Sequence, residues 1–456
     1  MDKVTEMLTH IGSYVMGLPF VVLIISTGIY FSVRLLLPQV RKLGHGAAIT
    51  LGYYDKPEHE GDISHFQALC AALSATVGVG NIAGVATAIH AGGPGALFWM
   101  WVSGFFGMAL KCVECTLAQK YRIIHKDGSV SGGPMYYIEK GLGPGFKWLA
   151  CMFAFCGMVA TFGGGNMVQS NSMTIAIVDH FAVQDKFLWR AVIGIFISIT
   201  VGLVIIGGIK RIGKVAGKLV PFMCVTYASG ALIIIFFNYD RVPETFYLIF
   251  KHAFTPTAAV GGFAGATVLY TITWGVKRAV FSNEAGVGSA PIAHAAARTD
   301  EPVREGLVGL LEPFVDTIIV CTMTGLVIIL TGSWQSGANS SILTKNAFET
   351  GLPVFGGIVV TMGLILFAVS TAISWSYYGD RCALYLFGQG AILPYRWIFV
   401  VALFIGATTQ INFVWGFSDI TFGLMAFPNL IAIIALSDDV VGLFKDYFSQ
   451  RHERTK

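Results

Sequence analysis

The sequence predicts an all-α polytopic membrane protein with eleven transmembrane helices. Of its 456 residues 55% are hydrophobic and only 12% are charged, and the mean hydropathy is +0.68. Soluble domains carry roughly 25% charged residues, so a soluble enzyme of this composition would expose too much apolar surface. The apolar runs are continuous rather than alternating, which argues against an outer-membrane barrel. The net charge of +4 gives no indication of nucleic-acid binding.

Eleven segments are long and apolar enough to cross the hydrocarbon core, which takes about 20 residues of helix. The second has Gly and Asn near its middle, and the seventh is too long and too polar for one continuous helix. The expected spans are residues 12–36, 66–90, 94–119, 148–178, 189–208, 215–238, 258–296, 305–332, 353–379, 391–410 and 412–437.

Basic residues between the spans predict the orientation, because cytoplasmic loops are enriched in Lys and Arg. With the N-terminus outside, the inner segments hold 23 basic residues and the outer segments hold six. The inner set includes Lys56, Lys126, Arg451, Arg454 and Lys456. We therefore expect a multi-pass protein of the cell membrane, with its N-terminus outside and its C-terminus in the cytoplasm.

The ten spans after the first form two groups of five, and an odd number of spans gives the two groups opposite orientations. Each group opens with an interrupted span, at the VGVGN motif of 77–81 and in the region 275–284. Paired Gly-interrupted spans in two inverted halves indicate a transporter binding site. The expected organisation is an extra N-terminal transmembrane helix with a cytoplasmic amphipathic linker (1–64), a first inverted repeat (65–238), an extracellular connection (239–257), a second inverted repeat (258–437) and a cytoplasmic tail (438–456).

The first interruption offers backbone groups to a ligand. Unwound backbone at membrane depth is tolerated only where it is buried in protein or lines a wet cavity. The N–H groups of Val79 and Gly80, which open the following half-helix, suit a carboxylate. A kinked helix that only packs closely is the alternative. The residues that offer oxygens to a hard cation such as sodium are Ser74, Thr76, Val77 and Asn81.

Two longer motifs resemble a known family. The VGVGN motif, followed by GGPGA at 92–96, resembles sodium-coupled amino-acid transporters of the leucine-transporter fold. The stretches GGPGALFWMW at 92–101 and GVKRAVFSNEAGVGS at 275–289 are similar to the signature of the alanine or glycine:cation symporter family. The resemblance covers essentially the whole chain and implies a 5+5 inverted repeat preceded by one extra N-terminal helix.

The resemblance also implies two sodium sites. One combines carbonyls of the first core helix with hydroxyls of the eighth, and the matching residues are Ser74, Val77, Phe367, Ser370 and Thr371. A second sodium in such folds touches the substrate carboxylate, and the matching residues are Thr76, Asn81 and Thr271. The number of sodium ions stays open, because it varies among relatives with this fold.

The resemblance places the substrate amine and side chain near a second half-helix break at 270–275. There Thr273 is expected to accept from the ammonium, while Trp274 and Trp375 wall a pocket small enough to suit alanine or glycine. The alternative for either Trp alone is lipid-facing packing.

The span 148–178 adds a polar stripe at helical spacing. A polar face on a membrane helix is expected to look toward a cavity, and hydrogen bonding between helices is the alternative. The span has no Tyr for the substrate carboxylate, a contact that the fold family often supplies. The stripe residues expected at the substrate site are Phe162, Asn166 and Gln169, with Gly165 between them.

Charged residues inside spans are costly unless they are paired or hydrated. We expect Lys277, Arg278 and Glu284 to form a salt-bridged cytoplasmic hinge beyond the second break, with an inner gate as the alternative. Buried ion pairing is expected for Lys111, Glu114 and Asp316, with a proton relay as the alternative.

These features predict a secondary transporter that imports a small neutral amino acid, alanine or glycine, with sodium by alternating access. Its partners are then the substrate, sodium and the lipid bilayer, with no cofactor, no nucleic acid and no obligate protein partner. The alternatives are an ion channel, a sodium-coupled transporter of another small solute, or an intramembrane enzyme. The enzyme would use Asn283, Glu284 and the CxxC pair of Cys112 and Cys115.

Overall fold

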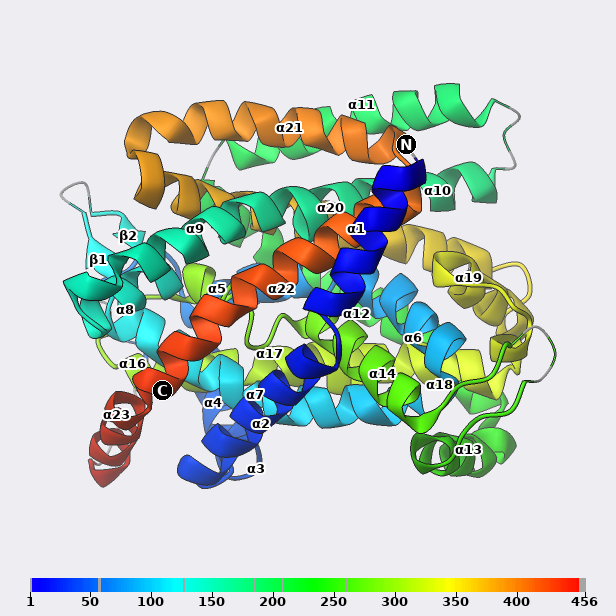
Figure 1. Cartoon of the computed structure of the whole chain (residues 1–456), viewed down its shortest axis with the longest axis horizontal. Coiled ribbons are helices and arrows are strands. Elements are labelled where there is room, and N and C mark those ends of the chain that lie inside the picture. Colours follow the sequence, from blue (N-terminus) through cyan, green and yellow to red (C-terminus); the bar gives the residue numbers. More distant parts are fainter. Residues whose placement is uncertain are drawn as a thin grey trace.

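The computed structural model shows an almost entirely helical molecule built from long apolar helices (Figure 1). It describes residues 2–55, 59–125, 128–181, 183, 185–206, 208–259, 261 and 263–450. Five basic residues used in the orientation argument, and the end of the expected tail, lie outside these ranges. The five are Lys56, Lys126, Arg451, Arg454 and Lys456.

Nine helices in the described ranges are long and apolar enough to cross a membrane, and a bent pair makes a tenth. The pair joins His65–Thr76 to Gly80–Gly92 at an angle of 51°. The expected span 258–296 contains no continuous spanning helix, because its longest helix, α14 (Val268–Asn283), has 16 residues. The nine are Lys3–Arg34, Ala96–Lys120, Pro144–His180, Lys186–Ile205, Gly208–Phe237, Pro302–Leu330, Gly356–Phe387, Gln389–Thr408 and Ile411–Ala435.

Several spans are assembled from consecutive helical pieces. In chain order the span elements are α1 (Asp2–Val15), α2 (Leu18–Arg34), α5 (His65–Thr76), η1 (Gly80–Gly84), α6 (Val85–Gly92), α7 (Ala96–Lys120), η2 (Pro144–Phe146), α9 (Lys147–Phe162), η3 (Gly163–Met167), α10 (Val168–His180), α11 (Lys186–Ile205), α12 (Gly208–Phe237), α14 (Val268–Asn283), α15 (Pro291–His294), α16 (Pro302–Gly309), α17 (Leu311–Pro313), η5 (Phe314–Cys321), α18 (Thr322–Leu330), α20 (Gly356–Phe387), η7 (Gln389–Ala391), α21 (Ile392–Thr408) and α22 (Ile411–Ala435). The connecting elements are α3 (Pro38–Arg41), α4 (Leu43–Thr50), α8 (Pro134–Gly141), η4 (Tyr239–Arg241), α13 (Val242–Phe254), η6 (Ser333–Gln335), α19 (Ser340–Gly351), α23 (Ser437–Ser449) and the antiparallel strands β1 (Ile123–Ile124) and β2 (Val130–Ser131).

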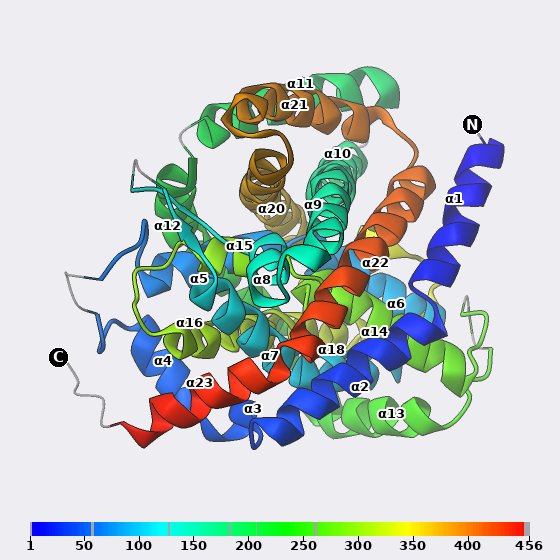
Figure 2. The ribbon, with the colours of Figure 1, turned by 60° about the vertical axis from the view of Figure 1, so that its left-hand side comes forward.

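The spans pack around a central group formed by the bent pair, α7, α9–α10, α14 and α20. Helices α11 and α21 lie against each other at one edge of the molecule, and α1 runs along α22 (Figures 1 and 2). The outer faces of α11 and α12 expose large apolar side chains, among them Phe196, Leu203, Phe222 and Phe236. Such faces suit lipid, because hydrocarbon tails solvate apolar surface and every backbone group of a helix is paired internally.

Local sequence signals explain where the helices near the centre begin. Helix α5 starts at a capping box in which Ser64 accepts from the Gln67 backbone and the Gln67 side chain accepts from the Ser64 backbone. This arrangement satisfies two of the N–H groups that a helix start leaves free. Helix α14 starts at Thr267, whose side chain accepts from the Tyr270 backbone.

Candidate functional site

The first helix break lies at residues 77–79, which confirms the interruption predicted from the VGVGN motif. Helix α5 ends where Val77 takes ψ of 88°, and π-helical η1 starts at Gly80. The amide of Gly78 donates to Oδ1 of Asn81 (2.8 Å), and the amide of Val79 donates to Oε1 of Gln169 (3.2 Å). Side-chain oxygens thus hold the amides at the start of the second half-helix, and an incoming acceptor can replace them without refolding the backbone.

The second break lies at residues 284–290, so the predicted interruptions at 270–275 and 275–284 are wrong. Helix α14 continues through Asn283, and the chain turns at Glu284, whose φ is +56°, and at Gly286 and Gly288 with φ of +83° and +87°. The charges that suggested an earlier break are tolerated inside the helix because both cations pair with one carboxylate. Nζ of Lys277 lies 2.6 Å from Asp419, and Nη1 of Arg278 lies 3.4 Å from it.

A short repeat marks both breaks and was overlooked in the sequence. Gly78-Val-Gly80 lies in the first break and Gly286-Val-Gly288 lies in the second. The second pair of glycines is required by its positive φ, a conformation that other residues rarely adopt. The repeated triplet was therefore a better indicator of the second break than the charged residues before it.

The two breaks meet near the centre of the molecule. A Cβ on Gly80 would lie 3.0 Å from Cα of Ser282, so the first break packs against the end of α14. A Cβ on Gly107 of α7 would lie 2.8 Å from Cβ of Ala285 in the second break. Segments η1, η3 and η5 are π-helical, and all three contribute residues to this region. Such segments are rare and occur frequently at functional sites.

Residues expected at the first sodium site come together between α5 and α20. Oγ of Ser74 donates to the carbonyl of Ser370 (2.9 Å), and Oγ of Ser370 donates to the carbonyl of Phe367 (2.9 Å). The hydroxyl of Thr371 is buried without a hydrogen-bond partner among the described residues. A Cβ on Gly78 would lie 2.5 Å from this hydroxyl, so it faces the backbone next to Val77. An orphaned buried oxygen beside unwound backbone fits a hard cation.

A second polar cluster surrounds the buried carboxylate of Asp316 in η5. Nδ2 of Asn81 donates to it (2.6 Å), as do the hydroxyls of Ser282 (2.9 Å to Oδ2) and Thr317 (2.8 Å). The cluster thus joins the first break, the end of α14 and a π-helix. Sequence reasoning placed Asn81 here, treated Asp316 as one member of an ion pair, and missed Ser282 and Thr317.

Two threonines assigned to the second sodium site lie outside this cluster. Oγ1 of Thr271 donates to the carbonyl of Gly92 (2.8 Å), which joins the end of α6 to the first turn of α14. Twelve residues of helix, about 18 Å at 1.5 Å per residue, separate Thr271 from the end of α14 at Asn283. The hydroxyl of Thr76 donates to its own helix at the carbonyl of Ala72 (3.2 Å), so only its backbone is free to face the break.

The polar stripe of α9 and α10 is divided between two neighbours. Gln169 contacts the first break, whereas Nδ2 of Asn166 donates to the carbonyl of Phe399 in α21 (2.7 Å). Phe162 packs its ring against Tyr395 at 5.5 Å, also on α21. The π-helical turn η3 between Phe162 and Gln169 inserts one residue into the helical register, so an α-helical spacing does not keep these side chains on one face.

The two indoles expected to wall one pocket lie apart. Nε1 of Trp375 donates to Oε1 of Glu284 in the second break (2.8 Å). Its ring packs against Gly165, where a Cβ would lie 2.3 Å from Cγ of the indole. Trp274 is only partly buried and lies 5.1 Å from both Nζ of Lys277 and Cζ of Arg278. The structure therefore brings Trp375 to the breaks and leaves Trp274 with the ion pair. Thr273 is also directed away from the breaks, since its hydroxyl donates to the carbonyl of Leu269 (2.8 Å).

Aromatic rings and the ion pair close one side of the breaks. Phe281 stacks on Phe422 at 5.3 Å and lies 4.7 Å from Trp415, and the guanidinium of Arg278 lies over Trp415 at 4.4 Å. The Asp419 ion pairs join α14 to α22 in the same layer.

A chain of buried ionisable side chains closes the other side. Glu305 of α16 binds Nδ1 of His65 at the start of α5 and Nδ1 of His294 in α15 (2.6 Å). Nε2 of His294 lies 3.7 Å from Glu312, whose other oxygen lies 3.0 Å from Nζ of Lys111. The chain therefore ties the half-helix before the first break and the half-helix after the second break to α16 and α7. Buried ion pairing of Lys111 is confirmed, with Glu312 as its partner.

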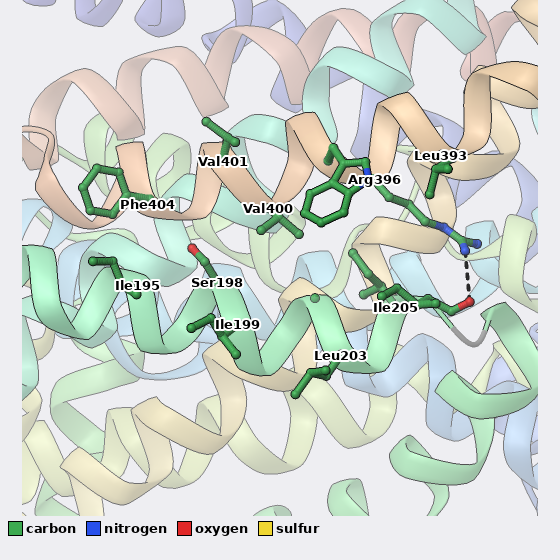
Figure 3. A pocket seen from close by; sticks show the side chains of 13 residues that line it. Ile195, Ser198, Ile199, Leu203, Ile205, Leu393, Arg396, Val400, Val401 and Phe404 are labelled. Carbon is green, nitrogen blue, oxygen red and sulfur yellow. Dashed lines mark hydrogen bonds between the residues drawn. The ribbon is translucent and has the colours of Figure 1, made fainter.

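A lipid-facing groove lies elsewhere and is not part of this site. It runs between α11 and α21, has a volume of about 490 Å³, and is lined by aliphatic and aromatic side chains (Figure 3). Arg396 lies at one end, where it donates to the carbonyl of Ile206 (3.2 Å) and pairs with Asp380 (2.5 Å). Grooves of this composition on a membrane-spanning surface suit acyl chains.

Comparison with known proteins finds relatives that match nearly the whole chain. The chain is 45% identical over 463 residues to the sodium/alanine symporter AgcS of Methanococcus maripaludis, covering all of both chains. It is 36% identical to the probable sodium/glutamine symporter GlnT of Bacillus subtilis, covering 94% of this chain and 88% of that one. The crystal structure of MhsT in complex with L-phenylalanine superposes with a TM-score of 0.60 at 13% identity, covering 84% of this chain and 95% of that chain, which shows the fold.

The fold of MhsT is the leucine-transporter fold, in agreement with the resemblance in the sequence. The model of the sodium:alanine symporter family matches residues 1–456. Family membership identifies a sodium-coupled transporter and sets aside the enzyme and the channel. With a family model and a full-length relative in agreement, the chain belongs to the sodium:alanine symporter family.

Proposed function

We propose that this protein imports alanine or glycine together with sodium by alternating access. The observation that carries the proposal is the meeting of two helix breaks at Gly80 and Ser282. The first break presents the start of a half-helix and the second presents the end of one. A helix start favours negative charge and a helix end favours positive charge, so an amino-acid zwitterion fits between them.

In this proposal the topology has eleven spans. Ten of them are the nine long helices of the described ranges and the bent pair. The remaining span, the seventh in chain order, consists of α14, the second break and α15, which together replace one continuous helix. The spans after α2 form two inverted groups of five, with the repeats bounded as 65–238 and 258–437. The N-terminus lies outside and the C-terminus in the cytoplasm, which places the chain of His65, Glu305 and His294 on the inner side.

The substrate carboxylate binds the amides of Val79 and Gly80, with Asn81 beside it. Gln169 releases the Val79 amide on binding, because the two acceptors compete for the same N–H group. The substrate ammonium binds backbone carbonyls at the end of α14, which a helix end leaves unpaired. This assignment replaces Thr273, whose hydroxyl bonds its own helix.

Sodium occupies two sites beside the substrate. The first uses the carbonyls of Ser74, Val77 and Phe367 with the hydroxyls of Ser370 and Thr371. The second uses the Asp316 cluster, with oxygens of Asn81, Ser282 and Thr317, in place of Thr271. Carboxylate, carbonyl and hydroxyl oxygens are the ligands that hard cations prefer. Sodium and substrate share the first break, so each raises the affinity of the other by linkage.

The side-chain pocket is walled by Trp375 and Phe422, which lie 5.1 Å apart by ring centroids. Rings at this distance are in contact with each other, so the pair forms one rigid wall of the pocket. Alanine is the solute in the name of the relative at 45% identity, which supports alanine or glycine over glutamine, the solute in the name of the relative at 36% identity. A sodium-coupled transporter of another small solute stays the second candidate.

Uptake into proteoliposomes tests the proposal. Labelled alanine should accumulate only with an inward sodium gradient, and the rate of its uptake should saturate as the alanine concentration rises. Unlabelled alanine added outside should then release the label by exchange, and the released label should still be alanine. Accumulation of glutamine but not of alanine would select the second candidate. Sodium flux that neither saturates nor responds to any amino acid would contradict symport.

A further inference from the structure

A pocket of about 240 Å³ lies where the first span leaves the membrane, far from the substrate site. Its walls are the end of α2, the turn into α3 and one face of α23, segments about 400 residues apart in the sequence. Figure 2 shows α23 lying beside the end of α2 and beside α3. Arg34 joins the two walls through Asp438 (2.7 Å) and Ser437 (3.0 Å).

Four cations and no acidic side chain line this pocket in the described part of the chain: Arg34, Arg41, Lys42 and Lys445. Arg34 is neutralised by Asp438. No ion pair joins the other three to a carboxylate within the described ranges. Nζ of Lys42 instead lies 3.7 Å from the ring centre of Phe448. Burial lowers the pKa of Lys42, and the neighbouring Arg41 lowers it further, so an anion beside both cations would offset their mutual repulsion.

The rim of the pocket is apolar and partly strained. Leu36 is 66% exposed and Val40 is 63% exposed, at the end of an apolar span. Leu36 and Leu37 have φ of +57° and +55°, a left-handed conformation that side chains with a Cβ rarely adopt. Backbone held in such a conformation by its surroundings points to a local function. The turn leaves exposed Leu side chains beside a cluster of cations, directly after an apolar span.

Both walls begin at the membrane boundary. Helix α2 ends its apolar span at Arg34, and α23 starts at Ser437, directly after α22 ends at Ala435. Helix α23 buries Val440, Phe444 and Tyr447 against the protein, so it lies along the molecule rather than extending from it. An occupant must therefore combine negative charge with apolar chains that continue into the bilayer.

We propose that this pocket binds the headgroup of an anionic phospholipid in the leaflet where α2 ends. The phosphate contacts Arg41, Lys42 and Lys445, since basic clusters next to a span attract anionic lipid and guanidinium binds phosphate in two-pronged geometry. The acyl chains lie along Leu36 and Val40. The bound lipid links the extra N-terminal helix to α23, independently of which solute the protein transports.

Native mass spectrometry of the full-length protein in detergent tests the site. Phosphatidylglycerol and phosphatidylcholine with identical acyl chains are titrated against the protein and against Arg41→Gln/Lys42→Gln/Lys445→Gln. A basic residue near an anionic surface contributes roughly a factor of five in affinity. We therefore expect the triple variant to bind phosphatidylglycerol on the order of a hundredfold more weakly, with phosphatidylcholine unaffected.

The exposed cations Lys186, Arg241 and Lys251 provide a matched control. The variant Lys186→Gln/Arg241→Gln/Lys251→Gln removes the same charge from surfaces that are not part of the pocket, and its affinity should stay within about twofold. Equal losses in both variants would reduce the effect to net charge and overturn the proposal. Equal binding of phosphatidylcholine would also overturn it.

Two further measurements distinguish the proposed lipid from other possible occupants of the pocket. Inorganic phosphate that displaces the lipid at equal concentration would make the pocket a site for free phosphate and contradict the proposal. A change of oligomeric state in the triple variant would make the surface a contact between copies and contradict it as well. If the triple variant does not fold, Arg41→Gln/Lys445→Gln changes only two exposed side chains and should still weaken phosphatidylglycerol binding about 25-fold.

Discussion

Replacing Thr371 by Val removes one oxygen from the first proposed sodium site and nearly preserves the shape of the side chain. In the structure this hydroxyl is buried and has no hydrogen-bond partner among the described residues. An unsatisfied buried polar group costs about 1–3 kcal/mol, so Thr371→Val should leave the ion-free protein as stable as before or more stable. A hydrogen bond to a charged group contributes about 1.5–3 kcal/mol. If the contact between the Thr371 hydroxyl and sodium has this strength, losing it should weaken sodium binding about ten- to 150-fold.

The assay is thermal unfolding of the purified protein over a sodium titration, with potassium keeping the ionic strength constant. Sodium stabilises only the folded state that binds it, so the midpoint of the temperature shift reports the sodium affinity. Ser376→Ala is the control, because it removes another hydroxyl of α20 that bonds only its own helix, at the carbonyl of Ile373 (2.7 Å). The alanine affinity of Thr371→Val should recover at saturating sodium if the two ligands are linked. An unchanged sodium midpoint in Thr371→Val would refute the assignment of this residue.

Three further substitutions test the substrate site and the buried charges. Gly80→Val should abolish the stabilisation of the protein by alanine, because a Cβ at this position would lie 3.0 Å from Cα of Ser282. Gly84→Ala is the control and should bind alanine normally, because the space around its Cβ is open. Normal transport by Gly80→Val would rule out the carboxylate site. In competition binding, Trp375→Ala should allow valine or leucine to bind and should weaken the binding of glycine by about 1–3 kcal/mol. Trp274→Ala should keep the order of affinities of these amino acids. The same order of affinities in both variants would show that Trp375 does not wall the pocket. Lys111→Met leaves Glu312 buried without its cation and should lower the free energy of unfolding by about 3–5 kcal/mol. Lys345→Met removes a cation from an ion pair at the surface and should lower it by less than about 1 kcal/mol in the same measurement. Similar losses in the two variants would show that Lys111 and Glu312 do not act as a buried pair.

The first break could be predicted from the sequence because its signal is local. Gly78, Gly80 and Asn81 interrupt an otherwise apolar run, and each has a role in the structure that its residue type already indicates. The second break was misplaced because the deciding interaction is not local. Lys277 and Arg278 look incompatible with a buried helix until Asp419, about 140 residues later, is known to lie beside them. Charge cost alone therefore predicts that a partner exists, not where the helix ends.

Helical register explains the other errors at the candidate site. A spacing argument assumes 3.6 residues per turn, whereas η3 and η5 each contain a π-helical turn that rotates all later side chains. In α9–α10 this rotation sends Asn166 to α21 and Gln169 to the first break. In η5 the altered turn holds Asp316 next to Thr317, with Asn81 and Ser282 donating to the same carboxylate. The glycine-rich sequence of 163–165 permits such a turn, whereas at η5 the local signal is Pro313, directly before its first residue, which predicts a disturbed helix but not a π-helical turn. Residues that a π-helix brings to a site are thus identified only by the contacts they make, and the Asp316 cluster could not have been assembled from spacing.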